Sequence, residues 1–122
     1  MKDSPRILIV DDDSSIGTML KRALARHGFV ADATSSAEEA LALADATAYD
    51  AALVDLVMPG RDGANLADEL RKRIPGIPVG LLTGYRNSPL VTAAERSGAR
   101  LFPKPVIIQE VVEFLRTEIT SR

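Results

Sequence analysis

Short apolar segments alternate with amphipathic segments along the whole chain. The apolar segments are rich in Val, Ile, Leu and Ala, a pattern typical of strands buried on both faces of a parallel sheet. Between them, apolar residues recur at the spacing of helices that cover a sheet. We expect strands at 7–10, 29–34, 51–55, 77–82 and 100–102, and helices at 14–27, 36–48, 64–73, 88–97 and 107–120. This alternation predicts an α/β fold: a doubly wound, five-stranded parallel sheet with five helices on its two faces.

Length and charge narrow the possible classes of protein. A chain of 122 residues, 46% of them hydrophobic, can close one core but is too short for two convincing cores, so we expect residues 1–122 to form a single domain. The net charge of -2 argues against a nucleic-acid surface. No cysteine is present, which excludes thiolate metal sites and fits a reducing compartment. No apolar segment is long enough to span a membrane. We therefore expect a cytoplasmic protein that contacts neither nucleic acid nor membrane through this domain.

Polar side chains follow four of the five expected strands. Asp11 and Asp12 follow the first strand, Asp55 ends the third, and Thr83 and Lys104 follow the fourth and fifth. The carboxyl ends of parallel strands meet at one edge of a sheet, where ligands of such sheets bind. We therefore expect three carboxylates, a hydroxyl and an ammonium group to converge in one crevice.

This combination of groups predicts phosphoryl chemistry. Adjacent carboxylates repel one another and raise one another's pKa unless a cation joins them. Oxygen-only ligands suit Mg2+, which usually takes one or two carboxylates, keeps waters and shares the oxygens of a phosphate. Lys104 and Thr83 could hold the other oxygens of a phosphoryl group that is transferred to Asp55. Considered alone, Lys104 would be interpreted as a solvated lysine and Thr83 as a helix cap. The phosphoryl-transfer interpretation depends on all five polar residues meeting at one edge of the sheet.

Four motifs together resemble the receiver domain of bacterial two-component response regulators. They are residues 7–12 followed by Asp13-Ser14, Asp55 followed by Met58-Pro59-Gly60 and Asp62-Gly63, Leu82-Thr83-Gly84, and Lys104-Pro105. The resemblance covers nearly the whole chain and implies a flavodoxin-like sheet of strand order 2-1-3-4-5. It also implies a phosphoprotein of phosphorelay signal transduction, which accepts a phosphoryl group on Asp55 from a sensor histidine kinase or a histidine phosphotransfer protein.

The resemblance further implies a metal site and a switch. Asp12, Asp55 and the backbone carbonyl of Val57 would bind Mg2+ directly, and Asp11 would act mainly through water. Thr83 and Lys104 would contact the phosphoryl group. Thr83 would be the switch hydroxyl, and Lys104 would be the ion-pair partner of the phosphoryl group. The Lys104-Pro105 peptide would be cis.

The resemblance also implies a partner surface. A homodimer or a downstream target would bind the face formed by the fourth helix, the fifth strand and the fifth helix, where Ile107 and Phe114 lie off the apolar stripe of the last helix. Such a domain catalyses its own phosphorylation and dephosphorylation and is not a turnover enzyme in the usual sense.

One position departs from the family pattern. An aromatic residue usually stands on the fifth strand three residues before the lysine, whereas this chain has Leu101 there and Phe102 one place later. Neighbouring residues of a strand point to opposite faces, so the two positions are not equivalent.

Two other classes of protein share part of the signal. A haloacid-dehalogenase-type phosphohydrolase also uses an aspartyl phosphate with Mg2+, Thr and Lys, and Asp11-Asp12-Asp13 permits its Asp-x-Asp arrangement after the first strand. Against this class, the chain has no room for a substrate-selecting cap, and Asp55 would be unexplained. A receiver-like interaction module that works without phosphorylation fits Leu101 but not the complete acidic set.

Overall fold

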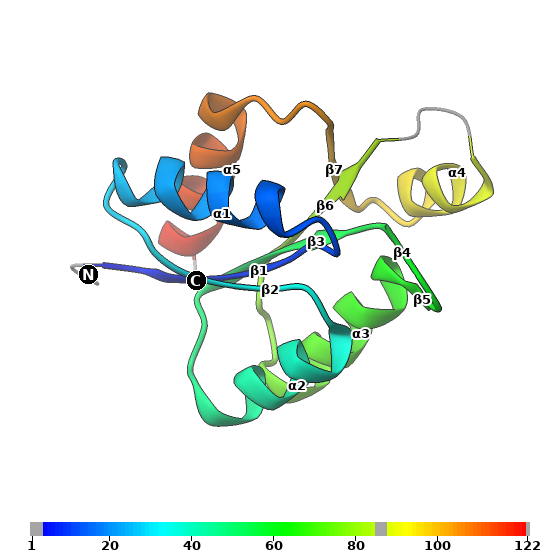
Figure 1. The fold of residues 1–122 in the computed structure, drawn as a ribbon, viewed down its shortest axis with the longest axis horizontal. Helices are drawn as coiled ribbons and strands as arrows, with labels where there is room; N and C mark the ends of the chain where they lie inside the picture. The colour runs from blue at the N-terminus through cyan, green and yellow to red at the C-terminus, as the bar shows by residue number, and fades with distance from the viewer. Residues whose placement is uncertain (1–3, 85–87, 122) are drawn as a thin grey trace.

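The computed structural model describes residues 4–84 and 88–121, which form a parallel sheet between two layers of helices (Figure 1). The strands of this sheet are β1 (Arg6–Val10), β2 (Val30–Thr34), β3 (Ala51–Asp55), β6 (Val79–Thr83) and β7 (Arg100–Pro103). Their order is β2-β1-β3-β6-β7, and all four pairings are parallel. Because β6 and β7 are the fourth and fifth strands of the sheet along the chain, the predicted order 2-1-3-4-5 is confirmed.

Five helices cover the sheet, as predicted. They are α1 (Ser14–Ala25), α2 (Ala37–Ala46), α3 (Gly63–Arg73), α4 (Pro89–Arg96) and α5 (Ile108–Thr120). Helices α1 and α5 lie on one face, and α2 and α3 lie on the other (Figure 1). In the described part of the chain, no helix combines the length and the apolar character that a membrane span requires.

Side-chain caps explain where four of the helices begin. The carboxylates of Asp13 and Asp62 accept hydrogen bonds from the first-turn N–H groups of α1 and α3, at 3.0 and 2.7 Å. The hydroxyls of Ser36 and Ser88 do the same for α2 and α4, both at 3.1 Å. Most observed helices and strands are one to three residues shorter than the sequence pattern suggests, because that pattern does not report where the backbone hydrogen bonds stop.

The two central strands separate two apolar layers. Along β1, Leu8 and Val10 face the layer of α2, α3 and α4, while Ile7 and Ile9 face the layer of α1 and α5. All four side chains are fully buried. The edge strand β2, by contrast, contains exposed and half-buried residues as well as buried ones. The continuous apolar runs therefore mark the central strands, as expected for a parallel sheet.

Leu101 and Phe102 point to opposite faces of β7. Leu101 packs in the α4 layer, whereas Phe102 is 1% exposed in the α5 layer, with its ring edge-on to Phe114 at a centroid distance of 5.4 Å. Gly80 in the neighbouring strand makes room for this ring, because a Cβ atom there would lie 2.7 Å from Cε2 of Phe102. The aromatic side chain is therefore held in the core on the side away from α4.

Substituting Gly80 by alanine is expected to lower the free energy of unfolding by about 2 kcal/mol, because the added methyl overpacks the core against Phe102. Urea unfolding measures the change. Gly84→Ala is the control, since the nearest atom to its Cβ would be 4.0 Å away. Combining Gly80→Ala with Phe102→Leu should recover part of the loss. Equal losses in Gly80→Ala and Gly84→Ala would show that the ring is free to move aside.

Candidate functional site

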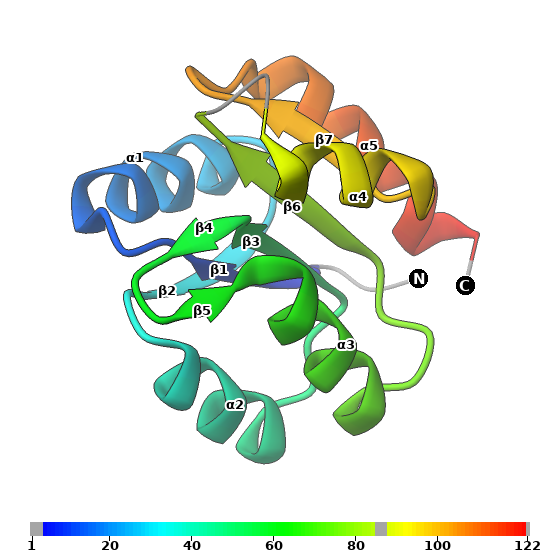
Figure 2. The same cartoon turned by 90° about the vertical axis from the view of Figure 1, so that its right-hand side faces the viewer.

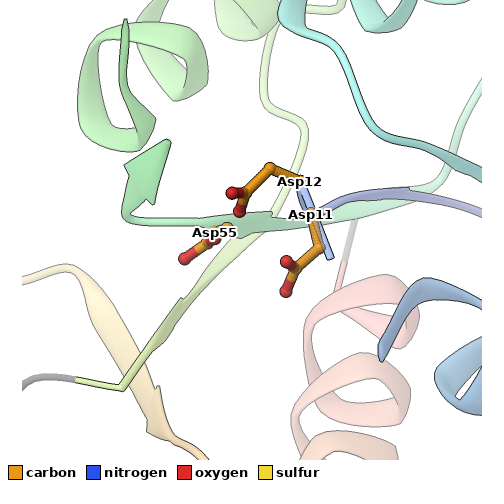
Figure 3. Close-up of side chains that lie close together, drawn as sticks. All are labelled: Asp11, Asp12 and Asp55. Atoms are coloured by element: carbon orange, nitrogen blue, oxygen red, sulfur yellow. The ribbon is translucent and has the colours of Figure 1, made fainter. Parts of the chain in front are cut away.

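Three carboxylates meet at the carboxyl edge of the sheet (Figure 3). Asp11 and Asp12 follow the end of β1, and Asp55 is the last residue of β3. One oxygen of each can be chosen so that all three lie within 4.8 Å of one another. Asp11 and Asp55 are 1% and 4% exposed, while Asp12 is exposed to solvent. The site thus has a buried floor and one side chain open to approach.

Lys104, which follows β7, supplies the positive charge beside two of these carboxylates. Its Nζ lies 2.9 Å from Oδ2 of Asp11 and 3.5 Å from Oδ1 of Asp55. Burial lowers the pKa of this ammonium group, but the hydrogen bond and charge of Asp11, together with the charge of Asp55, outweigh burial and leave the pKa raised. Lys104 is therefore a cation at neutral pH. The peptide that joins it to Pro105 is cis, as expected.

Thr83 ends β6 at the same edge of the sheet. It is 5% exposed, and it directly follows Leu82, the residue that pairs with Asp55 in the ladder. The backbone carbonyl of Thr83 accepts a hydrogen bond of 2.7 Å from the N–H of Lys104. The ends of β6 and β7 are therefore joined directly beside the acidic side chains.

A short hairpin, β4 (Val57–Met58) with β5 (Arg61–Asp62), leads from Asp55 to α3 (Figure 2). The N–H of Val57 donates to Oδ1 of Asp55 at 3.4 Å, so the hairpin begins in contact with the site. The chain then returns so closely that a Cβ atom at Gly63 would clash with the carbonyl oxygen of Asp55 and lie 2.7 Å from Cα of Leu56. Only glycine fits this close approach.

Asp13 is a contributor that the sequence reasoning missed. Its backbone N–H donates to Oδ1 of Asp11 at 2.9 Å, which leaves Oδ2 of Asp11 facing Lys104. The Asp13 side chain accepts from the side chain and backbone of Ser15, and these bonds lower its pKa. The run of three aspartates in the sequence could have indicated this role. Asp13 caps α1 with its side chain and orients the Asp11 carboxylate with its backbone N–H.

Burial and the two neighbouring carboxylates raise the pKa of Asp55 to about 7. Burial is the largest cause, followed by the hydrogen bond with Asp12 and the charge of Asp11; Lys104 and the N–H of Val57 act in the opposite direction. The three carboxylates thus carry more negative charge than one lysine can offset. Clustered carboxylate oxygens whose negative charge is only partly neutralised are suited to a divalent cation. Asp11, Asp12 and Asp55 could therefore bind a metal.

Comparison with known proteins identifies this arrangement. Residues 7–116 match the family model described as "Response regulator receiver domain". The chain belongs to the response regulator receiver family. The receiver domain resembles the DNA-binding transcriptional regulator NtrC of Salmonella typhimurium, with 35% identity over 115 residues. That match covers 93% of this chain but 24% of NtrC, so the chain spans about a quarter of the length of this relative.

Solved receiver structures have the same fold. A CheY-like receiver domain protein from Methanospirillum hungatei has a TM-score of 0.84 and 28% identity, and the match covers 97% of this chain and 95% of that one. A response regulator from Burkholderia pseudomallei, solved with a phosphorylated aspartic acid, a calcium ion and citrate, has a TM-score of 0.82 and 27% identity. That match covers 97% of this chain and 70% of the other.

Membership of the receiver family shows the general function of this domain. Receiver domains act in two-component signal transduction, interact with histidine kinases, and are typically phosphoproteins that bind Mg2+. The phosphohydrolase and the phosphorylation-independent module are not favoured by these matches.

Proposed function

We propose that Asp55 accepts the phosphoryl group in a Mg2+-dependent reaction. The observation that carries this proposal is the place of the Asp55 carboxylate. It is buried at the end of a central strand beside Asp11 and Asp12, with Lys104 3.5 Å away (Figure 3). In this position, the Lys104 ammonium can bind the oxygens of the incoming phosphoryl group. The phosphodonor can approach Asp55 from the carboxyl edge of the sheet. The phosphorylated aspartic acid of the Burkholderia neighbour is consistent with this assignment.

The acidic cluster would hold the metal. Asp12, Asp55 and the backbone carbonyl of Val57 would be direct ligands, and Asp11 would act mainly through water. These donors are all oxygens, which Mg2+ prefers. Burial first, and then the hydrogen bond with Asp12 and the charge of Asp11, raise the pKa of Asp55, so a divalent cation would favour its ionised form. Bound there, Mg2+ would supply positive charge against the oxygens of the phosphoryl group.

The chain's own residues would then position the transfer. An Oδ atom of Asp55 attacks phosphorus and forms a P–O bond, while the bond from phosphorus to the donor breaks and its electron pair leaves with the donor. The Lys104 ammonium holds one phosphoryl oxygen, and the Thr83 hydroxyl donates to another. In such a transfer, positioning and charge stabilisation supply most of the catalysis.

The donor would be a sensor histidine kinase or a histidine phosphotransfer protein, and we place the protein in the cytoplasm, where such donors present their phosphohistidine. Residues 1–122 would form one receiver domain.

Asp55→Asn is expected to abolish phosphorylation by acetyl phosphate, because the amide is not a nucleophile for this transfer. Incorporation by the wild type should require Mg2+ and stop in excess chelator. Phosphate-affinity electrophoresis measures both. Asp50→Asn is the control, since Asp50 lies at the opposite end of β3, where it accepts a hydrogen bond from the N–H of Arg6. Phosphorylation of Asp55→Asn at the wild-type rate would refute the assignment.

We further propose that a second copy or a downstream target binds the α4, β7 and α5 face. Ile107 at the start of α5 is 58% exposed and supports this proposal, whereas Phe114 packs against Phe102 and offers only part of its ring. Ile107→Lys is expected to weaken phosphorylation-dependent association at least about tenfold, as sedimentation velocity would measure. If the phosphorylated Ile107→Lys protein associates as strongly as the phosphorylated wild type, Ile107 does not lie in the interface.

A further inference from the structure

A second candidate site lies at the opposite end of the sheet from Asp55. The last turns of α3 and α5 flank the starts of β6 and β7 (Figure 2). An open groove of about 460 Å³ lies between these elements. Its lining includes Arg71 from α3, Arg100 from β7, and Phe114 and Glu118 from α5. None of these residues takes part in the phosphoryl site.

Arg100, which lines this groove, lies close to two aromatic rings. Its guanidinium carbon lies 4.7 Å from the ring centroid of Phe102 and 5.9 Å from that of Phe114. The two rings are themselves packed edge to face, and Phe102 is locked over Gly80. Cation–π contacts of this kind hold a planar guanidinium without using its N–H groups. Part of the entropic cost of ordering this long side chain is therefore met before any ligand binds.

The guanidinium group of Arg100 has no anionic partner in the described part of the chain. No carboxylate of residues 4–84 or 88–121 forms an ion pair with it, and its N–H groups make no hydrogen bond there. Among the described residues, the one ion pair of Arg71 is with Asp68, at 3.2 Å. The Asp68 side chain is 70% exposed, so this pair is easily exchanged. Two arginines against Glu118 leave the groove with a net positive lining.

The groove also has an apolar wall. Ile77 and Pro78, which lead into β6, and Phe114 of α5 contribute apolar atoms to its lining. An inorganic anion would use the arginines but leave this wall uncovered. A ligand with an apolar group beside a carboxylate would use both, because the guanidinium fork matches a carboxylate with two parallel hydrogen bonds.

We propose that this groove binds an organic carboxylate, with the carboxylate on Arg100 and an attached apolar group against Phe114 and Pro78. The site is independent of the phosphorylation site and would be present in the unphosphorylated protein.

Titration of the 15N-labelled protein with N-acetylphenylalanine tests the proposal. We expect saturable amide shifts at Gly76 and Gly98, which line the groove, with a dissociation constant on the order of 1 mM. N-acetylphenylalaninamide has the same ring without the charge and should bind at least about fivefold more weakly. Inorganic phosphate supplies the charge without the ring and should also bind at least about fivefold more weakly.

Two variants complete the test. Arg100→Gln should weaken binding of N-acetylphenylalanine at least about fivefold, and Arg100→Lys, which keeps the charge but loses the planar fork, at least about twofold. Arg22→Gln is the matched control, because Arg22 lines a groove on α1 that contains no aromatic ring, and it should change nothing. The proposal is overturned by any of three results: absence of saturable shifts at Gly76 and Gly98 at about 10 mM ligand, equal affinity for the acid and its amide, or unchanged affinity in Arg100→Gln.

Discussion

Lys104→Met is expected to slow Mg2+-dependent phosphorylation by acetyl phosphate about 10²–10³-fold, the usual cost of removing one group that stabilises charge in a transition state. The Lys104 ammonium lies 3.5 Å from the Asp55 oxygen and carries its charge at neutral pH. Methionine has a similar length and no charge, so it removes the electrostatic contribution while filling the space. Rapid-quench measurement of the phosphorylated fraction gives the rate.

Two further variants separate charge from folding in this experiment. Lys72→Met removes a surface ammonium that pairs with Glu69 on α3 at 3.6 Å, and its rate should stay within about twofold of the wild type. Lys104→Arg retains the charge beside the buried Asp11 carboxylate and should recover part of the lost rate. A rate for Lys104→Met within about threefold of the wild type would show that this lysine does not hold the phosphoryl group.

The metal-free protein is expected to lose stability as pH rises from about 4 to about 7. The pKa of Asp55 is about 7 in the folded protein against an ordinary 3.8, so the folded state binds this proton more tightly than the unfolded state. The resulting stabilisation is complete below pH 4 and is lost as the pH passes through 7. At ~1.4 kcal/mol for each pH unit, the difference is roughly 4 kcal/mol. Thermal melts in chelator at pH 5 and pH 8 should register about two thirds of it, since part of the loss occurs below pH 5.

Asp12→Asn should reverse this dependence in part. The substitution removes one negative charge from the cluster, so in chelator at pH 8 the variant should melt about 3–5 °C above the wild type. Millimolar Mg2+ should raise the melting temperature of the wild type by ligand linkage and leave Asp12→Asn nearly unchanged. Asp68→Asn, at an exposed position on α3, is the control and should respond as the wild type does. An Asp12→Asn protein that is less stable than the wild type in chelator would contradict the mutual repulsion of these carboxylates.

The sequence predicts the sheet because its central strands contain continuous apolar runs. In β1 and β3 the only polar residues stand at a strand end, Arg6 at the start of β1 and Asp55 at the end of β3, and helical spacing between the strands requires parallel crossovers. Once the strands are parallel, the residues that follow them must meet at one edge. This is why the sequence alone predicts that Asp11, Asp55 and Lys104, which are far apart in the chain, lie close together.

Other features depend on packing that a linear pattern does not encode. The hairpin of β4 and β5 has two residues in each strand, too few to show a period. The alternation of β7 predicts that Leu101 and Phe102 face opposite sides, but not that the Phe102 ring lies over Gly80 and under Arg100. The contacts of Lys104 likewise depend on the conformation of the segment between β7 and α5, which sequence spacing does not specify.

The most direct test of the central claim is the position of the phosphoryl group. The wild-type protein is phosphorylated with acetyl phosphate in Mg2+, aspartyl phosphate is reduced with borohydride to homoserine, and peptides are sequenced by mass spectrometry. We predict homoserine at position 55 and at no other aspartate. Homoserine at position 11 or 13 instead would place the nucleophile after β1, as in the phosphohydrolases, and would contradict the assignment of Asp55 as the phosphoacceptor.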